Sequence, residues 1–266
     1  VREYNLVSRW VLANLLAVPL FAILLGALFG MPNSIIVGLL LVAVAPGAPF
    51  IPQLIAMAGE NSQEAIRLTA ALTVVATVTV PLLVAATLLI LQLEVRFSPW
   101  RFLVPLLIVL VLPLFAGGVL REWRPELAPS IARRLTTLAN ILLGLALGII
   151  VLLNPGGTVR VLAALFGTGA LLVIILFVIA TILLGWLAGG PTIQNRRILA
   201  LGTAGRNINI ALFIAVAAFP ETGVNGGLIA FTVLMFVISF LVALYWKRIN
   251  RVPEVGPGTK ESTGES

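Results

Sequence analysis

The stretch Gly202-Thr203-Ala204-Gly205-Arg206-Asn207-Ile208-Asn209 lies in the middle of an apolar segment that runs from about Ile198 to Phe219. Its two glycines weaken a helix at this point, and an arginine and two asparagines follow them. An arginine at the centre of a bilayer costs at least about 2.5–3.5 kcal/mol, so such residues face a protein interior or a water-filled cavity. The stretch therefore predicts a broken membrane helix in which Arg206 has a function.

A second interruption lies earlier in the chain, at Ala45-Pro46-Gly47-Ala48-Pro49-Phe50-Ile51-Pro52-Gln53. Its prolines are close enough together to favour a true break over a simple kink. Transporters bind substrate and coupling ion at broken helices near the middle of the membrane. The residues expected to form the two breaks are Pro46, Gly47, Pro49, Pro52, Gly202 and Gly205.

The composition of the chain indicates a membrane protein. Of its 266 residues, 60% are hydrophobic and 10% are charged, whereas a soluble domain has about 25% charged residues. The chain has no cysteine, histidine or aspartate, so zinc, haem and histidine-dependent catalysis lose their usual ligands and bases. We therefore expect no enzyme and no cofactor. The basic residues lie between apolar spans, which argues against a nucleic-acid partner.

Eight apolar segments predict an all-α polytopic membrane protein, because each can cross about 30 Å of hydrocarbon at about 1.5 Å per residue. The predicted spans are 9–29, 34–58, 64–92, 98–120, 129–153, 160–188, 192–219 and 223–247. They form one membrane domain, 1–251. The tail, 252–266, is rich in Pro, Gly, Ser and Thr and is expected to be disordered.

The distribution of basic residues predicts the orientation of the chain. With eight crossings, thirteen of the seventeen Lys and Arg residues lie on one side, three lie on the other, and Arg206 lies between. The positive-inside rule places both termini of this chain in the cytoplasm, in what we expect to be a bacterial inner membrane. Arg196 and Arg197 are interpreted as topology signals and Glu60 as a capping or loop residue. The tryptophans near span ends are interpreted as interfacial anchors: Trp10, Trp100, Trp123, Trp186 and Trp246.

The positions of the two breaks predict an internal repeat. The later break lies in the penultimate span of the segment 98–247, and the earlier break lies in the penultimate span of the segment 9–92. A five-plus-five inverted repeat has this arrangement if the first half lacks two helices at its start. The beginning of the chain at Val1 fits this expectation. The sequence leaves open whether the two helices are missing from the natural protein or only from this chain.

The break at Pro46-Gly47-Ala48-Pro49 and the stretch from Gly202 to Ala211, with Asn207 and the following Ile210-Ala211-Leu212, resemble the bile acid:sodium symporter family. Its fold extends to pantoate, arsenite and auxin carriers. In that family the fourth and ninth helices are unwound and cross near the bilayer centre. The resemblance covers nearly the whole chain, from the family's third helix to its tenth. It implies a panel domain, a core domain with both crossing helices, and transport by alternating access.

The positions that hold sodium in this family are changed here. The ninth-helix pattern Glu-Thr-Gly-x-Gln-Asn reads Gly202-Thr203-Ala204-Gly205-Arg206-Asn207, so the carboxylate is replaced by a glycine and the glutamine by an arginine. The family's Ser-Asn pair reads Ile51-Pro52. A sodium ion within about 5 Å of the guanidinium group would be repelled by several kcal/mol. We therefore expect the sodium sites to be lost, with Thr69 and Thr73 as candidate remnants.

Two roles remain open for Arg206. Its guanidinium group can replace a sodium ion and neutralise the carbonyl dipoles of the unwound backbone, or it can bind a carboxylate, sulfate or phosphate of the substrate. Snorkelling to an interface is disfavoured, because Arg206 lies roughly 12 Å or more from either end of its span. The expected substrate site consists of Arg206, Asn207, Asn209, Thr203, Pro49 and Gln53. For the asparagines, Gln53, Thr69 and Thr73 the alternative is helix packing.

Together these features predict a secondary-active or facilitative transporter of a small organic anion. The chain has no intramembrane carboxylate or histidine for a proton relay, so the coupling ion stays open. The alternatives are a non-transporting membrane scaffold or receptor subunit with the same fold, and a sodium-coupled symporter with ligands of another kind. The sequence does not determine the substrate or the oligomeric state.

Overall fold

The computed structural model describes residues 2–90, 92, 97–153, 163, 169–219 and 224–250. Within these residues the fold is all-helical, and the only β-type pairing is one isolated bridge. The described part contains five helices that are long and apolar enough to cross a membrane, and Ile208–Ala218 is a shorter apolar helix. The five are Leu6–Leu28, Ser62–Ile90, Pro99–Trp123, Ala170–Ala188 and Gly227–Asn250. The chain is therefore an integral membrane protein. The predicted tail, 252–266, lies outside the described residues.

The first helices of the chain surround the earlier break. A π-helical turn, η1 (Ala13–Ala17), joins α1 (Arg2–Leu12) to α2 (Val18–Leu28) without ending the helix. The chain then forms α3 (Asn33–Ala43), α4 (Ile51–Met57) and α5 (Ser62–Ile90). The predicted span 34–58 is thus two helices separated by seven residues, 44–50.

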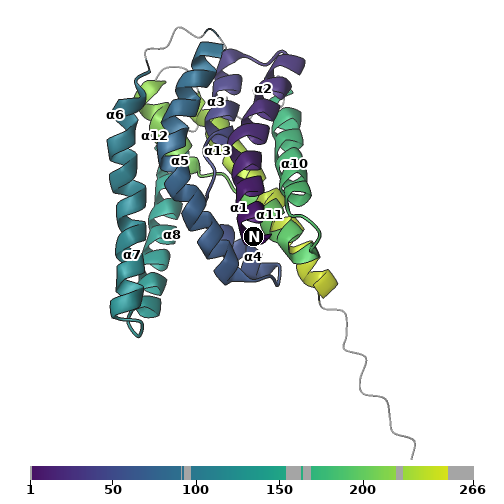
Figure 1. The fold of residues 1–266 in the computed structure, drawn as a ribbon. Helices are drawn as coiled ribbons and strands as arrows, with labels where there is room; N and C mark the ends of the chain where they lie inside the picture. Colours follow the sequence, from purple (N-terminus) through teal and green to yellow (C-terminus); the bar gives the residue numbers. More distant parts are fainter. Residues whose placement is uncertain are drawn as a thin grey trace, which may run out of the picture.

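The next helices form the side of the molecule marked by α6, α7 and α8 in Figure 1. They are α6 (Pro99–Leu106), the π-helical turn η2 (Leu107–Val111), α7 (Leu112–Trp123) and α8 (Ala128–Leu153). This group packs against the remaining described helices mainly through α5. Most of its described side chains are exposed. Because lipid tails are as apolar as leucine, exposed apolar side chains are expected on helices that face a bilayer.

The last four described helices surround the later break. They are α10 (Ala170–Ala188), α11 (Ile193–Ala204), α12 (Ile208–Ala218) and α13 (Val224–Asn250). The helices α10 and α11 pack very closely, because a Cβ atom at Gly185 would overlap the carbonyl oxygen of Leu199 and one at Gly189 would overlap the backbone of Arg196. Glycines four residues apart are a known device for the close approach of membrane helices.

Two buried apolar clusters hold these helices together. The helices α3 and α12 contribute to one cluster, whereas α4 and α11 contribute to the other. Each broken helix therefore passes from one cluster to the other at its break. The second cluster includes Trp10, which is only 1% exposed. The interpretation of Trp10 as an interfacial anchor is therefore wrong.

An ion pair ties the ends of α4, α11 and α13 together. Nη1 of Arg197 donates to Oε1 of Glu60 at 2.8 Å and also donates to Oδ1 of Asn250, while Nδ2 of Asn250 donates to the carbonyl oxygen of Ala58 at 3.0 Å. The paired side chains are only 10% and 9% exposed. Arg197 and Glu60 therefore form a buried structural contact, which their interpretation as a topology signal and a capping residue did not predict.

Candidate functional site: a crossing of two broken helices

The first break is shaped by a glycine that a larger residue cannot replace without strain. Gly47 has φ +85°, and a Cβ atom there would lie 2.9 Å from Oγ1 of Thr73 on α5. Pro46 and Pro49 lack the N–H group that a continuous helix needs. Pro52 differs from the prediction, because it lies in the first turn of α4, where a helix tolerates proline. The break therefore depends on Pro46, Gly47 and Pro49.

The second break is shorter and begins at Gly205. This residue leaves the helical conformation at φ −71° and ψ 99°, and a Cβ atom there would lie 2.5 Å from Cγ1 of Ile51. Gly202 differs from the prediction, because it lies inside α11 and not in the break. A Cβ atom at Gly202 would lie 2.7 Å from Cζ2 of Trp10. Gly202 is therefore needed because a residue with a side chain would not leave room for the Trp10 ring.

The two breaks meet each other through their backbones. Pro46 and Arg206 form an antiparallel bridge. The N–H of Asn207 donates to the carbonyl oxygen of Ala45 at 2.7 Å, and the N–H of Ala48 donates to the carbonyl oxygen of Gly205 at 3.4 Å. Unpaired backbone groups are costly in a membrane interior. At the crossing, each break supplies such hydrogen-bond partners to the other.

Arg206 lies at the centre of this crossing and is 0% exposed. Its Nη1 donates to the carbonyl oxygen of Ala43, the last residue of α3, at 3.3 Å. Its backbone N–H donates to Sδ of Met235 at 3.2 Å. Among the described residues no carboxylate forms an ion pair with it, and Nε and Nη2 have no partner. The guanidinium group thus occupies the negative end of the α3 dipole as a fixed cation.

The carbonyl oxygen of Gly47 is a second meeting point in the crossing. It accepts hydrogen bonds from Nδ2 of Asn207 at 3.3 Å and from Oγ1 of Thr73 at 3.4 Å. Thr73 also donates to the carbonyl oxygen of Thr69, one turn earlier on α5, at 2.8 Å. Oδ1 of Asn207 and Oγ1 of Thr69 are buried and have no partner. The structure therefore brings Asn207, Thr69 and Thr73 to one side of the crossing.

Thr203 makes its contacts with the first helix of the chain. Its Oγ1 accepts hydrogen bonds from Nε1 of Trp10 at 3.0 Å and from Nδ2 of Asn14 at 3.2 Å. Asn14 lies in the π-helical turn η1, is 0% exposed, and has an unpartnered Oδ1. Such turns often lie at functional sites. The sequence analysis missed Asn14, although a single asparagine within the apolar span 9–29 was a usable signal.

The remaining expected site residues lie on the surface. Asn209, Pro49 and Gln53 are exposed, whereas Thr203, Arg206 and Asn207 are buried. No hydrogen bond joins the exposed three to the buried three. The predicted six-residue site is thus divided in this conformation into three buried and three exposed residues.

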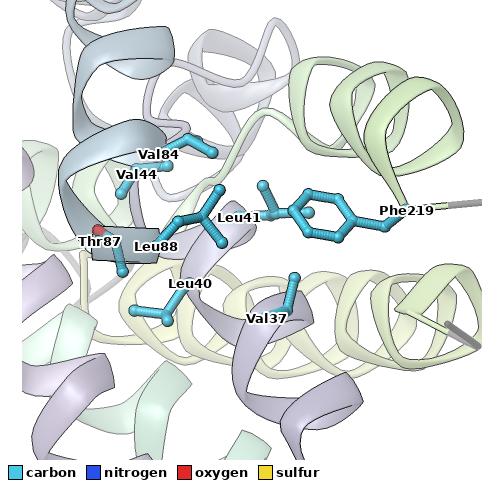
Figure 2. Close-up of a pocket in the computed structure, with 8 residues that line it drawn as sticks. All are labelled: Val37, Leu40, Leu41, Val44, Val84, Thr87, Leu88 and Phe219. Carbon is cyan, nitrogen blue, oxygen red and sulfur yellow. The ribbon is translucent and has the colours of Figure 1, made fainter. Parts of the chain in front are cut away.

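Neither of two crevices between helices supplies an anion site by itself. A narrow crevice between α3 and α5 reaches Phe219, and Figure 2 shows side chains without a charged group around it. It is lined by Val37, Leu40, Leu41, Val44, Val84, Thr87, Leu88 and Phe219. A wider crevice of about 360 Å³ lies between α5 and α7 and is lined by Val74 and Glu122, among others. Glu122, an acidic residue, is the one charged residue among the described residues that line this second crevice.

The sequence of the chain matches one family profile, that of the Sodium Bile acid symporter family, over residues 2–164. The match contains the first break and both threonines of α5, and it ends before the second break and Arg206. It therefore covers less of the chain than the resemblance described above. The family comprises transporters and not enzymes. No curated protein matches the chain.

Proposed function

The chain belongs to the sodium bile acid symporter family, and on this premise we propose that it transports small organic anions without sodium coupling. In this proposal Arg206 is a built-in cation at the position where relatives hold an ion. One observation supports it most directly: the fully buried guanidinium group donates to the carbonyl oxygen of Ala43 at the end of α3.

The electrostatics of the crossing oppose a bound sodium ion. Arginine stays protonated in proteins, so the crossing carries a permanent positive charge. A second unit charge about 4 Å away is repelled by about 4 kcal/mol at an effective dielectric constant near 20. A penalty of that size weakens binding roughly a thousandfold.

The same guanidinium group supports an anionic substrate. Nε and Nη2 of Arg206 retain N–H groups without partners, and these can donate to an anion. Hydrogen bonds between a guanidinium group and a carboxylate, sulfate or phosphate are charge-assisted and roughly twice as strong as neutral ones. Because these atoms are buried, the substrate reaches them only in a second conformation. The proposal therefore includes alternating access.

A membrane topology with eight crossings is part of this proposal. The helix pairs α3–α4 and α11–α12 each count as one interrupted span, and α8 with its 26 residues counts as another. Together with the five long apolar helices this makes eight crossings. An even number places both ends of the chain on one side, which the charge distribution assigns to the cytoplasm. The five-plus-five inverted repeat follows from the family resemblance.

A sodium-coupled symporter is the second candidate, and one observation favours it. Oγ1 of Thr69 and Oδ1 of Asn207 are buried oxygens without partners, and both belong to residues next to the Gly47 carbonyl network. Sodium binding at these oxygens would require that Arg206 swing away from the crossing. This candidate therefore predicts that sodium binding changes the environment of Arg206.

The two candidates are separated by thermal unfolding of the purified protein with taurocholate, benzoate and pyruvate, each in sodium chloride and in potassium chloride. A ligand that binds only the folded state raises the free energy of unfolding, by about 2.7 kcal/mol at one hundred times Kd, and with it the melting temperature. We expect at least one anion to raise it equally in both salts, and Arg206→Gln to abolish the rise. Arg133→Gln, which removes an exposed charge on α8, should leave it unchanged.

A rise that needs sodium and disappears in Thr69→Val would overturn the sodium-independent proposal in favour of the symporter. If Arg206→Gln does not fold, Arg206→Lys separates the two roles. Lysine keeps the positive charge but loses the planar fork, so we expect a folded protein with weaker anion binding and no gain of sodium dependence.

A further inference from the structure

Two arginines from different helices converge on the turn between α10 and α11. Nε of Arg196 donates to the carbonyl oxygen of Gly190 at 2.6 Å. Nη1 of Arg9, on α1, lies 3.6 Å from the position that a Cβ atom of Gly190 would occupy. Gly190 has φ +73°, a conformation that favours glycine after a helix end. This turn therefore holds both guanidinium groups beside the same residue.

Within the part of the chain that the structure describes, this arrangement places like charges together without a carboxylate paired to them. Since both groups adjoin Gly190, their separation is below the Debye length of about 8–10 Å. Among the described residues the carboxylates that form ion pairs are Glu60, which pairs with Arg197, and Glu126, which pairs with Arg124. Neither pairs with Arg9 or Arg196. A bound anion is the direct way to stabilise two guanidinium groups at this distance.

Aromatic and further basic residues show where this anion would lie relative to a membrane. Cζ of Arg196 lies 5.8 Å from the centre of the Trp186 ring, and that ring lies 5.8 Å from the ring of Trp246. Lys247 and Arg248 follow in the last turn of α13. Tryptophan rings at helix ends are typical of the level of the lipid headgroups. Arg9 and Arg196 thus lie beside a tryptophan and near further basic residues, as is expected at the depth of lipid phosphates.

An apolar stripe leads away from the same place along α10. Ile179, Leu183 and Leu187 are spaced four residues apart and are 43%, 55% and 75% exposed. Residues at this spacing share one face of a helix. A ligand with a phosphate between Arg9 and Arg196 and an apolar chain along α10 would cover both features. A free phosphate would leave the stripe uncovered.

We propose that Arg9, Arg196 and Trp186 bind the phosphate group of an anionic phospholipid, whose acyl chain lies along the exposed face of α10. The site is separate from the crossing, because Arg206 is fully buried between α3 and α13. Basic pockets between membrane helices are known to take such headgroups. The site does not depend on the proposed transport function, since it forms in the conformation described here.

Native mass spectrometry of the detergent-solubilised protein tests this site. The protein is mixed with equal amounts of phosphatidylglycerol and phosphatidylcholine of the same acyl composition. We expect the protein to retain one phosphatidylglycerol, and Arg9→Gln combined with Arg196→Gln to reduce its retention about tenfold or more, because each basic residue contributes a favourable term. The matched control, Arg121→Gln combined with Arg133→Gln, removes two exposed arginines elsewhere and should retain the lipid.

Three outcomes would overturn the proposal. The first is equal retention of both lipids by the wild-type protein. The second is an equal loss in the control variant, which would indicate general attraction to a positive surface. The third is displacement of phosphatidylglycerol by inorganic phosphate alone, which would indicate a free-phosphate site. If the double variant does not fold, the single variant Arg9→Gln is used, because Arg9 is exposed.

Discussion

At the scale of single residues, the crossing depends on Gly47. Its φ of +85° and the 2.9 Å from a Cβ atom there to Oγ1 of Thr73 give a substitution two costs, backbone strain and overlap with α5. We expect Gly47→Ala to lower the free energy of unfolding by about 1–3 kcal/mol or more, measured as a fall in melting temperature in detergent. Gly30→Ala is the control, since Gly30 has φ +56° with open space around it. An equal fall in melting temperature in both variants would show that backbone strain is the whole cost and that overlap with Thr73 adds nothing.

Arg206 shows how one residue type carries different information in sequence and in structure. Its depth in an apolar span predicted a buried, functional arginine, and the structure places it fully inside the protein. Its partner, the carbonyl oxygen of Ala43, lies 163 residues away in the chain. Nothing local to Arg206 identifies that partner. The contact with the end of α3 supports the first of the two roles that the sequence left open, and both roles stay predictions.

At the scale of helices, the contact between α10 and α11 depends on Gly185. A Cβ atom there would overlap the carbonyl oxygen of Leu199, which is backbone and cannot rotate away. We expect Gly185→Ala to separate the two helices and to lower the melting temperature strongly, because overpacking typically costs about 1–3 kcal/mol or more. Gly117→Ala on α7 is the control, since a Cβ atom there meets nothing within 4 Å. A smaller fall in melting temperature in Gly185→Ala than in Gly117→Ala would contradict the packing argument.

The ion pair between Glu60 and Arg197 joins three helix ends, and a double-mutant cycle measures its contribution. Removing one member of a buried pair costs about 3–5 kcal/mol because the other charge stays buried. We expect Glu60→Gln and Arg197→Gln each to destabilise the protein strongly, and the double variant to cost less than their sum. The pair Arg124–Glu126, whose side chains are 69% and 61% exposed, is the control, with an expected coupling of about 0–1 kcal/mol. Similar coupling for both pairs would contradict the burial argument.

At the scale of the whole molecule, the structure makes the side assignment testable. The contacts among Glu60, Arg197 and Asn250 place the ends of α4, α11 and α13 at one end of the molecule. Figure 1 shows the end of α4 and the turn after α7 at the same end of the drawing. The helix α5 runs from there to Ile90 at the opposite end.

Because the chain contains no cysteine, single cysteines can report the topology directly. We expect a membrane-impermeant maleimide to label Gln92→Cys in intact cells, and to label Asn61→Cys, Glu126→Cys and Gln194→Cys only after permeabilisation. All four positions are exposed in the structure. Labelling of Gln194→Cys from the outside would contradict eight crossings with both termini in the cytoplasm, since an odd number of spans would then separate it from Asn61.

Much of the fold could be predicted from the sequence because the signals are local. The apolar length of a helix and the positions of Pro46, Gly47 and Gly205 need no knowledge of the partner helix. The helices α5, α8 and α13 therefore lie close to the predicted spans. The predictions for Pro52 and Gly202 differ from the structure for a related reason. Proline starts a helix as readily as it breaks one, and glycine serves close packing as well as a break.

The sequence by itself determined that the chain is a helical membrane protein, where two of its helices are interrupted, and that an arginine lies at the second interruption. The tertiary structure alone decided that the two breaks pair through their backbones, that Trp10 is buried against Gly202, and that Arg197 pairs with Glu60. The physical reason is that lipid, and not water, surrounds these helices. A leucine-rich helix face is equally stable against lipid and against protein, so hydrophobicity cannot show which faces meet. The partner of each buried polar group is known only once the packing of the helices is known.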